Sequence, residues 1–188
     1  RALDTGQNAH RFSVEWSRVQ PDPDRWDDEA LEKYVEMARW LVNHGMTPMV
    51  TLHHFTDPLW LVRSGAWDNP ETPALFARFT RRVVSALKDY VNLWITINEP
   101  NIYVVSGYVE GVFPPGKSAL GLAAMVVENL ILGHAAAYRV IHEIQPEAQV
   151  GVATNYRSLV PARPWNPLDR LLRRAIVDGE VDGLGRGR

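Results

Sequence analysis

Short strand-like segments alternate with amphipathic segments along this chain, and this order constrains the fold more than any other feature. Apolar and β-branched runs predict strands over residues 11–16, 49–55, 91–98 and 149–155. Between them, apolar residues recur every three or four positions, which is the period of a helix that packs on one side. The order βαβαβαβ predicts a parallel sheet with right-handed crossovers.

The predicted helices carry their own start and stop signals. Asp27 or Asp28 is expected to cap the first helix, and Gly45 is expected to end it. A long loop is predicted over residues 101–121, and a short helix over residues 168–177. For the helix that follows the long loop we expect an inner face made of Val127, Leu130, Ile131, His134, Ala135, Tyr138 and Ile141.

Two architectures fit this order, an open doubly wound sheet and part of a barrel. No glycine-rich phosphate loop follows any of the strands, which argues against a dinucleotide-binding fold and a nucleotide cofactor. The polar residues stand at the carboxyl ends of strands, where barrel enzymes keep their active sites. A complete eight-stranded barrel needs about 250 residues. The 188 residues are therefore predicted to form one α/β domain, a partial (β/α)8 TIM barrel over 1–188.

Composition excludes several kinds of partner and site. The net charge of −2 favours neither nucleic acid nor an anionic membrane as a partner. The absence of cysteine excludes disulfides and thiolate metal sites. No apolar run reaches the roughly 20 residues that span a bilayer, and no signal peptide is recognisable, so we expect no membrane partner and a cytoplasmic location. The oligomeric state stays open.

The stretch from Trp94 to Pro100, with the sequence WITINEP, is the most informative motif. Glu99 at a barrel mouth is able to protonate a leaving-group oxygen and then deprotonate a water. Asn98 is able to hydrogen-bond a sugar hydroxyl. Because successive strand residues point to opposite faces, both enter one pocket only if the strand bends or bulges at its end. The motif also fits a buried strand whose polar end meets water.

Other polar residues near the predicted strand ends have two interpretations each. His53 and His54 are adjacent on a strand and diverge, so they cannot share a metal; one is expected to bind substrate, or to be a satisfied core histidine. Arg11 is suited to clamp a carboxylate from a neighbouring strand, or is a surface residue. Glu15 is a second candidate acid, or the partner of Arg18 in an ion pair. No metal-binding spacing accompanies the histidines, so no metal site is predicted.

Taken together, these motifs resemble glycoside hydrolase family 1, the β-glucosidase and β-galactosidase family, over about residues 8–156. The resemblance rests on order and spacing as well as on residue type. The matching motifs are Arg11-Phe12-Ser13 with Trp16-Ser17-Arg18, Thr51-Leu52-His53-His54 with Pro58, Trp94 to Pro100, Gly107-Tyr108 with Pro115-Gly116, and Asn129-Leu130 with His134-Ala135.

The resemblance implies a (β/α)8 barrel of which this chain holds about strands 2 to 5, and hydrolysis of terminal β-D-glycosidic bonds with retention. It places the acid/base at Glu99. It places Asn98 on the 2-hydroxyl of the sugar, His54 on the same sugar, and Arg11 beside the nucleophilic carboxylate. A small-molecule β-glycoside is the implied partner, and no cofactor is implied.

The chain also departs from the family pattern. The Glu-Asn-Gly motif that carries the nucleophile is absent from the sequence. From the resemblance we expect strand 1 and strands 6–8 of the barrel to lie outside these residues. Since retention requires two carboxyl groups, the 188 residues alone are expected to be inactive. Two alternatives stay open: a phospho-β-glycosidase of the same family, and a non-catalytic carbohydrate-binding remnant.

Overall fold

A computed structural model describes residues 3–156, 158 and 160–174 of the chain. The chain divides into two compact units, Arg1–Asn155 and Tyr156–Arg188. The expectation of a single domain over 1–188 stays a prediction.

The first unit contains a four-stranded parallel sheet in the order β1-β2-β3-β4. The strands are β1 (Ala9–Ser13), β2 (Thr47–His53), β3 (Leu93–Asn98) and β4 (Gln149–Ala153). Each strand pairs with the next along the chain, with Arg11 opposite Met49 and Met49 opposite Leu93. The predicted alternation of strands and helices is therefore confirmed, and all four strands end at one edge of the sheet.

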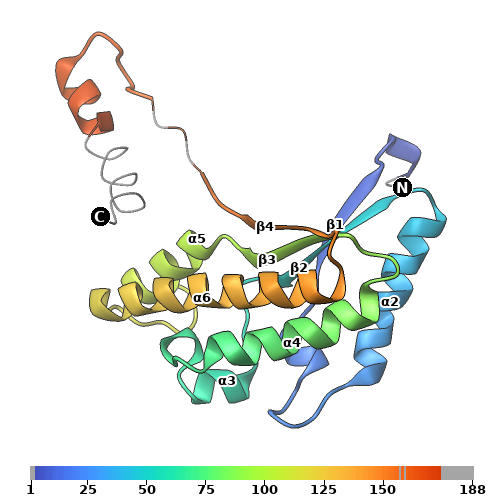
Figure 1. Cartoon of the computed structure of the whole chain (residues 1–188). Helices are drawn as coiled ribbons and strands as arrows, with labels where there is room; N and C mark the ends of the chain where they lie inside the picture. Colours follow the sequence, from blue (N-terminus) through green and yellow to red (C-terminus); the bar gives the residue numbers. More distant parts are fainter. Residues whose placement is uncertain (1–2, 157, 159, 175–188) are drawn as a thin grey trace. The chain divides into compact units, whose positions relative to one another are not determined.

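Three long helices cross between the strands and lie on one face of the sheet (Figure 1). They are α2 (Asp28–Asn43), α4 (Thr72–Leu87) and α6 (Leu120–Ile144). Shorter segments are η1 (Leu3–Thr5), α3 (Leu59–Arg63) and η2 (Ala66–Asp68). The core between helices and sheet is rich in fully buried aromatic side chains, namely Trp16, Trp67, Phe76, Phe79 and Trp94.

The signals expected around α2 are confirmed. Asp27 is the N-cap, and its carboxylate accepts a hydrogen bond of 2.8 Å from the Ala30 N–H. The helix ends at Asn43, and Gly45 follows with a φ of 72°, a left-handed conformation that glycine adopts without steric cost.

The first strand ends earlier than predicted. Strand β1 stops at Ser13, and residues Trp16–Val19 form the short helix α1 instead. Glu15 caps this helix, since its carboxylate accepts hydrogen bonds from the Ser17 N–H at 3.3 Å and the Ser17 hydroxyl at 2.7 Å. Local capping by a side chain competes with continuation of the strand, and the apolar pattern of residues 11–16 does not reveal this.

The segment expected to be a long loop is partly helical. Helix α5 (Pro100–Val104) and a π-helical turn, η3 (Val105–Val109), occupy the start of residues 101–121. Proline at the first helical position is pre-organised for a helix because its φ is already helical and its missing N–H needs no partner there. The prediction of a loop was therefore wrong over its first part.

The buried face of α6 differs from the expected one. Val127, Ile131 and Tyr138 are 41%, 62% and 44% exposed, whereas Leu130 and Ile141 are buried as expected. The other buried positions are Ala123, Val126, Asn129, Gly133, Ala137 and Val140. The helix is apolar around most of its circumference, so the period identifies the helix but not its orientation.

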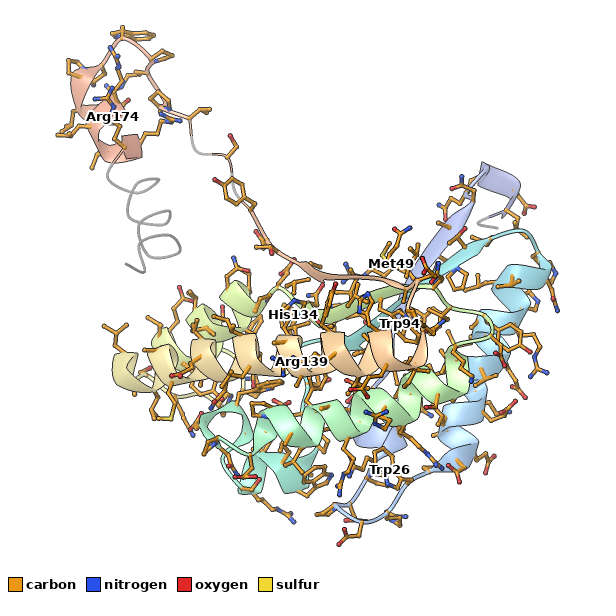
Figure 2. The ribbon with its side chains drawn as sticks, in the orientation of Figure 1. Trp26, Met49, Trp94, His134, Arg139 and Arg174 are labelled. Carbon is orange, nitrogen blue, oxygen red and sulfur yellow. The ribbon has the colours of Figure 1, made fainter. Side chains whose placement is uncertain are left out.

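Helix α6 also passes, by length and composition alone, the test for a helix that could cross a membrane, with a mean hydropathy of 1.6 over its most apolar stretch. This differs from the expectation that no segment is long and apolar enough. Helices in protein cores pass the same test. Trp94 and His134 lie between the sheet and α6 (Figure 2), and α6 packs against α4, with 33% of its most apolar stretch buried.

In the second unit, residues 167–174 are helical. This confirms the predicted helix of residues 168–177 up to residue 174, and the last three positions lie outside the described residues. Arg163 binds the Asp169 carboxylate, with 3.0 Å between Nε and Oδ2.

Candidate active site

The four residues singled out in the sequence lie at or near the carboxyl edge of the sheet. Asn98 is the last residue of β3, Glu99 follows it, and His54 follows β2. Arg11 lies in the middle of β1 and its guanidinium donates a hydrogen bond to the Asn98 side-chain oxygen across β2. The structure therefore joins the first and third strands of the sheet through a direct polar contact.

The backbone at the end of β3 has the irregularity that the sequence argument required. The pairing of β3 with β4 shifts register between Ile95 and Asn98. Glu99 then adopts a left-handed conformation, with φ 43° and ψ 58°, and its N–H donates to the Ala153 carbonyl at 2.6 Å. A left-handed non-glycine residue costs about 1–3 kcal/mol and such residues concentrate at functional sites. The bend that Asn98 and Glu99 would need to enter one pocket is therefore present at the end of β3.

His54 is exposed and is oriented by Ser13, whose hydroxyl lies 2.8 Å from its Nδ1. Its pKa is lowered by partial desolvation first, and then by the positive charges of Arg11 and His53, while Glu99 and Glu15 act in the opposite direction. The lowered pKa keeps the ring neutral near pH 7, with one nitrogen able to donate and the other to accept. These interactions also place His54 within electrostatic range of both Arg11 and Glu99.

The two adjacent histidines diverge as predicted, and only His54 faces the open edge. His53 is buried, and its Nε2 lies 3.1 Å from an Asp57 carboxylate oxygen. Its ring packs edge-on against Trp67 and Tyr103 at centroid distances of 5.3 and 5.4 Å. His53 is therefore a core histidine, and the substrate-binding interpretation falls to His54.

Neither interpretation offered for Glu15 describes its contacts. Besides capping α1 through Ser17, its carboxylate accepts a 2.7 Å hydrogen bond from the Thr56 hydroxyl. Thr56 belongs to the turn that follows His54. Glu15 thus links the segments that follow β1 and β2. In the sequence, only its position directly before a short helix could have indicated that it caps that helix.

Two residues of this edge were missed by the sequence argument, Asp57 and Tyr103. The Tyr103 hydroxyl donates to Asp57 at 2.7 Å, and burial followed by the Asp57 charge raises the pKa of Tyr103 far above its usual range. The only available signals were an acid shortly after a strand and a tyrosine one turn after Glu99. Neither distinguishes a buried hydrogen bond from a surface position.

No group of three or more histidine, aspartate or glutamate side chains is placed to hold a metal ion within residues 3–156, 158 and 160–174. What the four residues singled out in the sequence offer instead is the Glu99 carboxyl group, the Asn98 amide, the neutral His54 imidazole and the Arg11 guanidinium. Hydrogen-bonding groups of this kind suit a neutral polyol, and the carboxyl group suits proton transfer.

Parallel strands with helices on one face (Figure 1), and polar residues gathered at the carboxyl edge, are the arrangement found in part of a (β/α)8 barrel. The sequence model described as "Glycosyl hydrolase family 1" matches residues 3–175. The chain belongs to glycoside hydrolase family 1.

Curated relatives agree with this assignment. Beta-glucosidase A of Thermotoga maritima is 34% identical over 158 residues, which are 84% of this chain and 35% of that protein. A 6-phospho-beta-galactosidase of Clostridium acetobutylicum is 32% identical over 158 residues, covering 83% and 33% of the two chains. The chain thus spans about a third of the length of these relatives.

The fold comparison gives the same result. The solved structure of beta-glucosidase from Thermotoga maritima in complex with deoxynojirimycin matches with a TM-score of 0.86 at 31% identity, over 93% of this chain and 40% of that one. The beta-glycosidase from Pyrococcus horikoshii matches with a TM-score of 0.81 at 33% identity, over 96% and 42%. The predicted fold class is confirmed: an α/β chain that corresponds to part of a (β/α)8 barrel.

Proposed function

We propose that this chain supplies the acid/base half of a retaining β-glycosidase site, which hydrolyses terminal β-D-glycosidic bonds. The observation that carries the proposal is the left-handed turn at Glu99, directly beyond the Asn98–Arg11 hydrogen bond and within electrostatic range of His54. In this proposal Glu99 protonates the leaving oxygen and then deprotonates the attacking water.

The other groups bind and orient the sugar. Asn98 and neutral His54 hydrogen-bond sugar hydroxyls. Arg11, which already holds Asn98, pairs with a second carboxylate through its remaining donors. Retention requires that carboxylate about 5–5.5 Å from Glu99, and the sequence supplies no Glu-Asn-Gly motif for it. The 188 residues alone are therefore expected to show no turnover.

The test joins residues 1–155 to the remaining barrel segments of the Thermotoga maritima relative and compares the chimera with its Glu99→Gln variant. Glutamine cannot donate or accept the transferred proton, so β-glucosides with poor leaving groups should be cleaved about 10²–10⁴ times more slowly. Aryl glucosides with good leaving groups should lose far less in the glycosylation step. Glu128→Gln, an exposed carboxylate on α6, is the matched control. Equal losses on both substrate types contradict the acid role.

The Clostridium acetobutylicum relative supports keeping a phospho-β-glycosidase as the second candidate. A second chimera joins residues 1–155 to the downstream segments of that relative, and each chimera takes its phosphate preference from its joined segment. Hydrolysis of a 6-phosphorylated substrate by the second chimera, with a folded but inactive first chimera, shows that this chain works only beside a phospho-type segment and favours the alternative. Sugar binding without turnover in both folded chimeras favours a carbohydrate-binding remnant. The cytoplasmic location stays a proposal.

A further inference from the structure

Behind the open edge lies a buried carboxylate that the proposed chemistry does not use. Asp57 follows β2, and its side chain is only 5% exposed. Its Oδ1 lies 3.1 Å from His53 Nε2 and 3.2 Å from Trp67 Nε1, and its Oδ2 lies 2.7 Å from the Tyr103 hydroxyl. One carboxylate thus collects contacts from three separate segments of the chain.

Most donors and acceptors in this cluster are matched; the exception among the described residues is His53 Nδ1, which is buried without a hydrogen-bond partner. An ionised carboxylate only accepts hydrogen bonds, and the indole N–H only donates. Because burial and the charge of Asp57 both raise the pKa of Tyr103, the phenol stays protonated and donates as well. When His53 Nε2 carries the ring proton it donates to Asp57, and the Trp67 N–H, whose nitrogen lies 3.3 Å from the same atom, then donates to Asp57 instead.

The hydrogen bond between Asp57 and Tyr103 joins the two turns that carry the candidate site. Asp57 lies three residues after His54, separated from it by Phe55, whose φ is 67°, and Thr56. Tyr103 lies one helical turn after Glu99, and its N–H donates to the Glu99 carbonyl at 3.0 Å. The first turn of α5 therefore connects the phenol rigidly to the left-handed backbone at Glu99.

We propose that Asp57 and Tyr103 are positioning residues, whose hydrogen bond sets the placement of Glu99 relative to His54. The inference rests on the proposed function for the roles of Glu99 and His54, but the placement itself is a property of this chain. Left-handed residues such as Glu99 and Phe55 persist only where the surrounding structure holds them. The bond between Asp57 and Tyr103 supplies such a restraint on both turns at once.

The placement is measurable in the 188-residue chain without any turnover. The Glu99 charge raises the pKa of His54, so the NMR titration of the His54 ring reports how close Glu99 lies. His54→Gln assigns the signal among the six histidines. Glu99→Gln removes the charge and should therefore lower the His54 pKa.

Tyr103→Phe is the decisive variant, because a neutral phenol has no charge of its own to alter His54. If the hydroxyl holds Glu99 in place, Tyr103→Phe should lower the His54 pKa by a large part of the Glu99→Gln shift. In the Glu99→Gln background it should add nothing. Val84→Ala, which truncates a fully buried residue of α4, is the control for general loss of stability and should leave the His54 pKa unchanged.

Three results overturn the inference: a wild-type His54 pKa in Tyr103→Phe, an equal shift in the Glu99→Gln background, or no effect of Glu99→Gln itself. Asp57→Asn repeats the test from the other partner if circular dichroism shows that Tyr103→Phe is unfolded. A failure here leaves the turnover experiment on the chimera untouched, so the two proposals fail separately.

Discussion

The carboxyl edge of the sheet carries two polar clusters with nearly the same chemistry and opposite environments. The open cluster consists of Arg11, His54, Asn98 and Glu99, and the buried cluster consists of His53, Asp57, Trp67 and Tyr103. Each contains a histidine from the end of β2 and a carboxyl group. Neighbours in sequence fall into different clusters, as His53 and His54 do.

The comparison shows that surroundings, rather than residue type, decide what a polar group is used for. In the buried cluster the Asp57 oxygens are occupied by protein donors, because an unsatisfied buried polar group costs about 1–3 kcal/mol. In the open cluster, part of the hydrogen-bonding capacity of Arg11 and His54 faces solvent. The buried cluster is thereby suited to hold structure, and the open cluster to hold a ligand.

The largest expected contrast in stability is between Asp57→Ala and His54→Ala. The first leaves the His53 and Trp67 donors without their acceptor and should lower the free energy of unfolding by about 2–4 kcal/mol. The second removes an exposed ring and should change it by less than about 1 kcal/mol. Urea denaturation of the 188-residue chain measures both, and equal losses contradict the division into two clusters.

A smaller effect is expected where α6 presses on the buried cluster. A Cβ added at Gly133 would come within 2.7 Å of the Trp67 ring, so Gly133→Ala should destabilise by about 1–3 kcal/mol. Gly121→Ala lies in the same helix with nothing within 4 Å, and should be neutral or stabilise by up to about 0.5 kcal/mol. A thermal melt of each variant compares them. If Gly133→Ala also leaves the His54 titration unchanged, the disturbance of Trp67 in the buried cluster does not reach the open cluster.

The smallest expected effect is the pH dependence of stability above pH 5.5, where most carboxyl groups stay ionised. The pKa values of His54 and His134 are both lowered, His134 by burial. At pH values between the lowered pKa of each histidine in the folded chain and the usual value near 6.5, the unfolded chain binds more protons than the folded chain. The free energy of unfolding should therefore fall as the pH falls below about 6.5. His134→Gln and His54→Gln should each flatten this slope in urea midpoints measured from pH 7.5 to 5.5. A rise in stability on acidification over this range contradicts the sign.

Much of the fold and part of the site are predictable from the sequence, and the failures have a common cause. The strand order, the Asp27 cap and the Gly45 stop depend on residues close together in the chain, and all are confirmed. The alternation of side chains along a strand shows only that a bend at Glu99 is needed if Asn98 and Glu99 are to enter one pocket. The orientation of α6 was wrong because apolar residues surround that helix, so its buried side depends on where α4 and Trp67 lie.

The sequence by itself determined the α/β class, the parallel order of the strands, the family, and that Asn98 ends a strand with Glu99 directly beyond it. These follow from periodicity, capping and short motifs, which act over a few residues. Only the tertiary structure decided that His53 is buried while His54 is open, that Glu15 links two segments, and that Asp57 binds Tyr103. Burial and hydrogen-bond pairing depend on residues far apart in the chain, and no local pattern specifies which of them will meet.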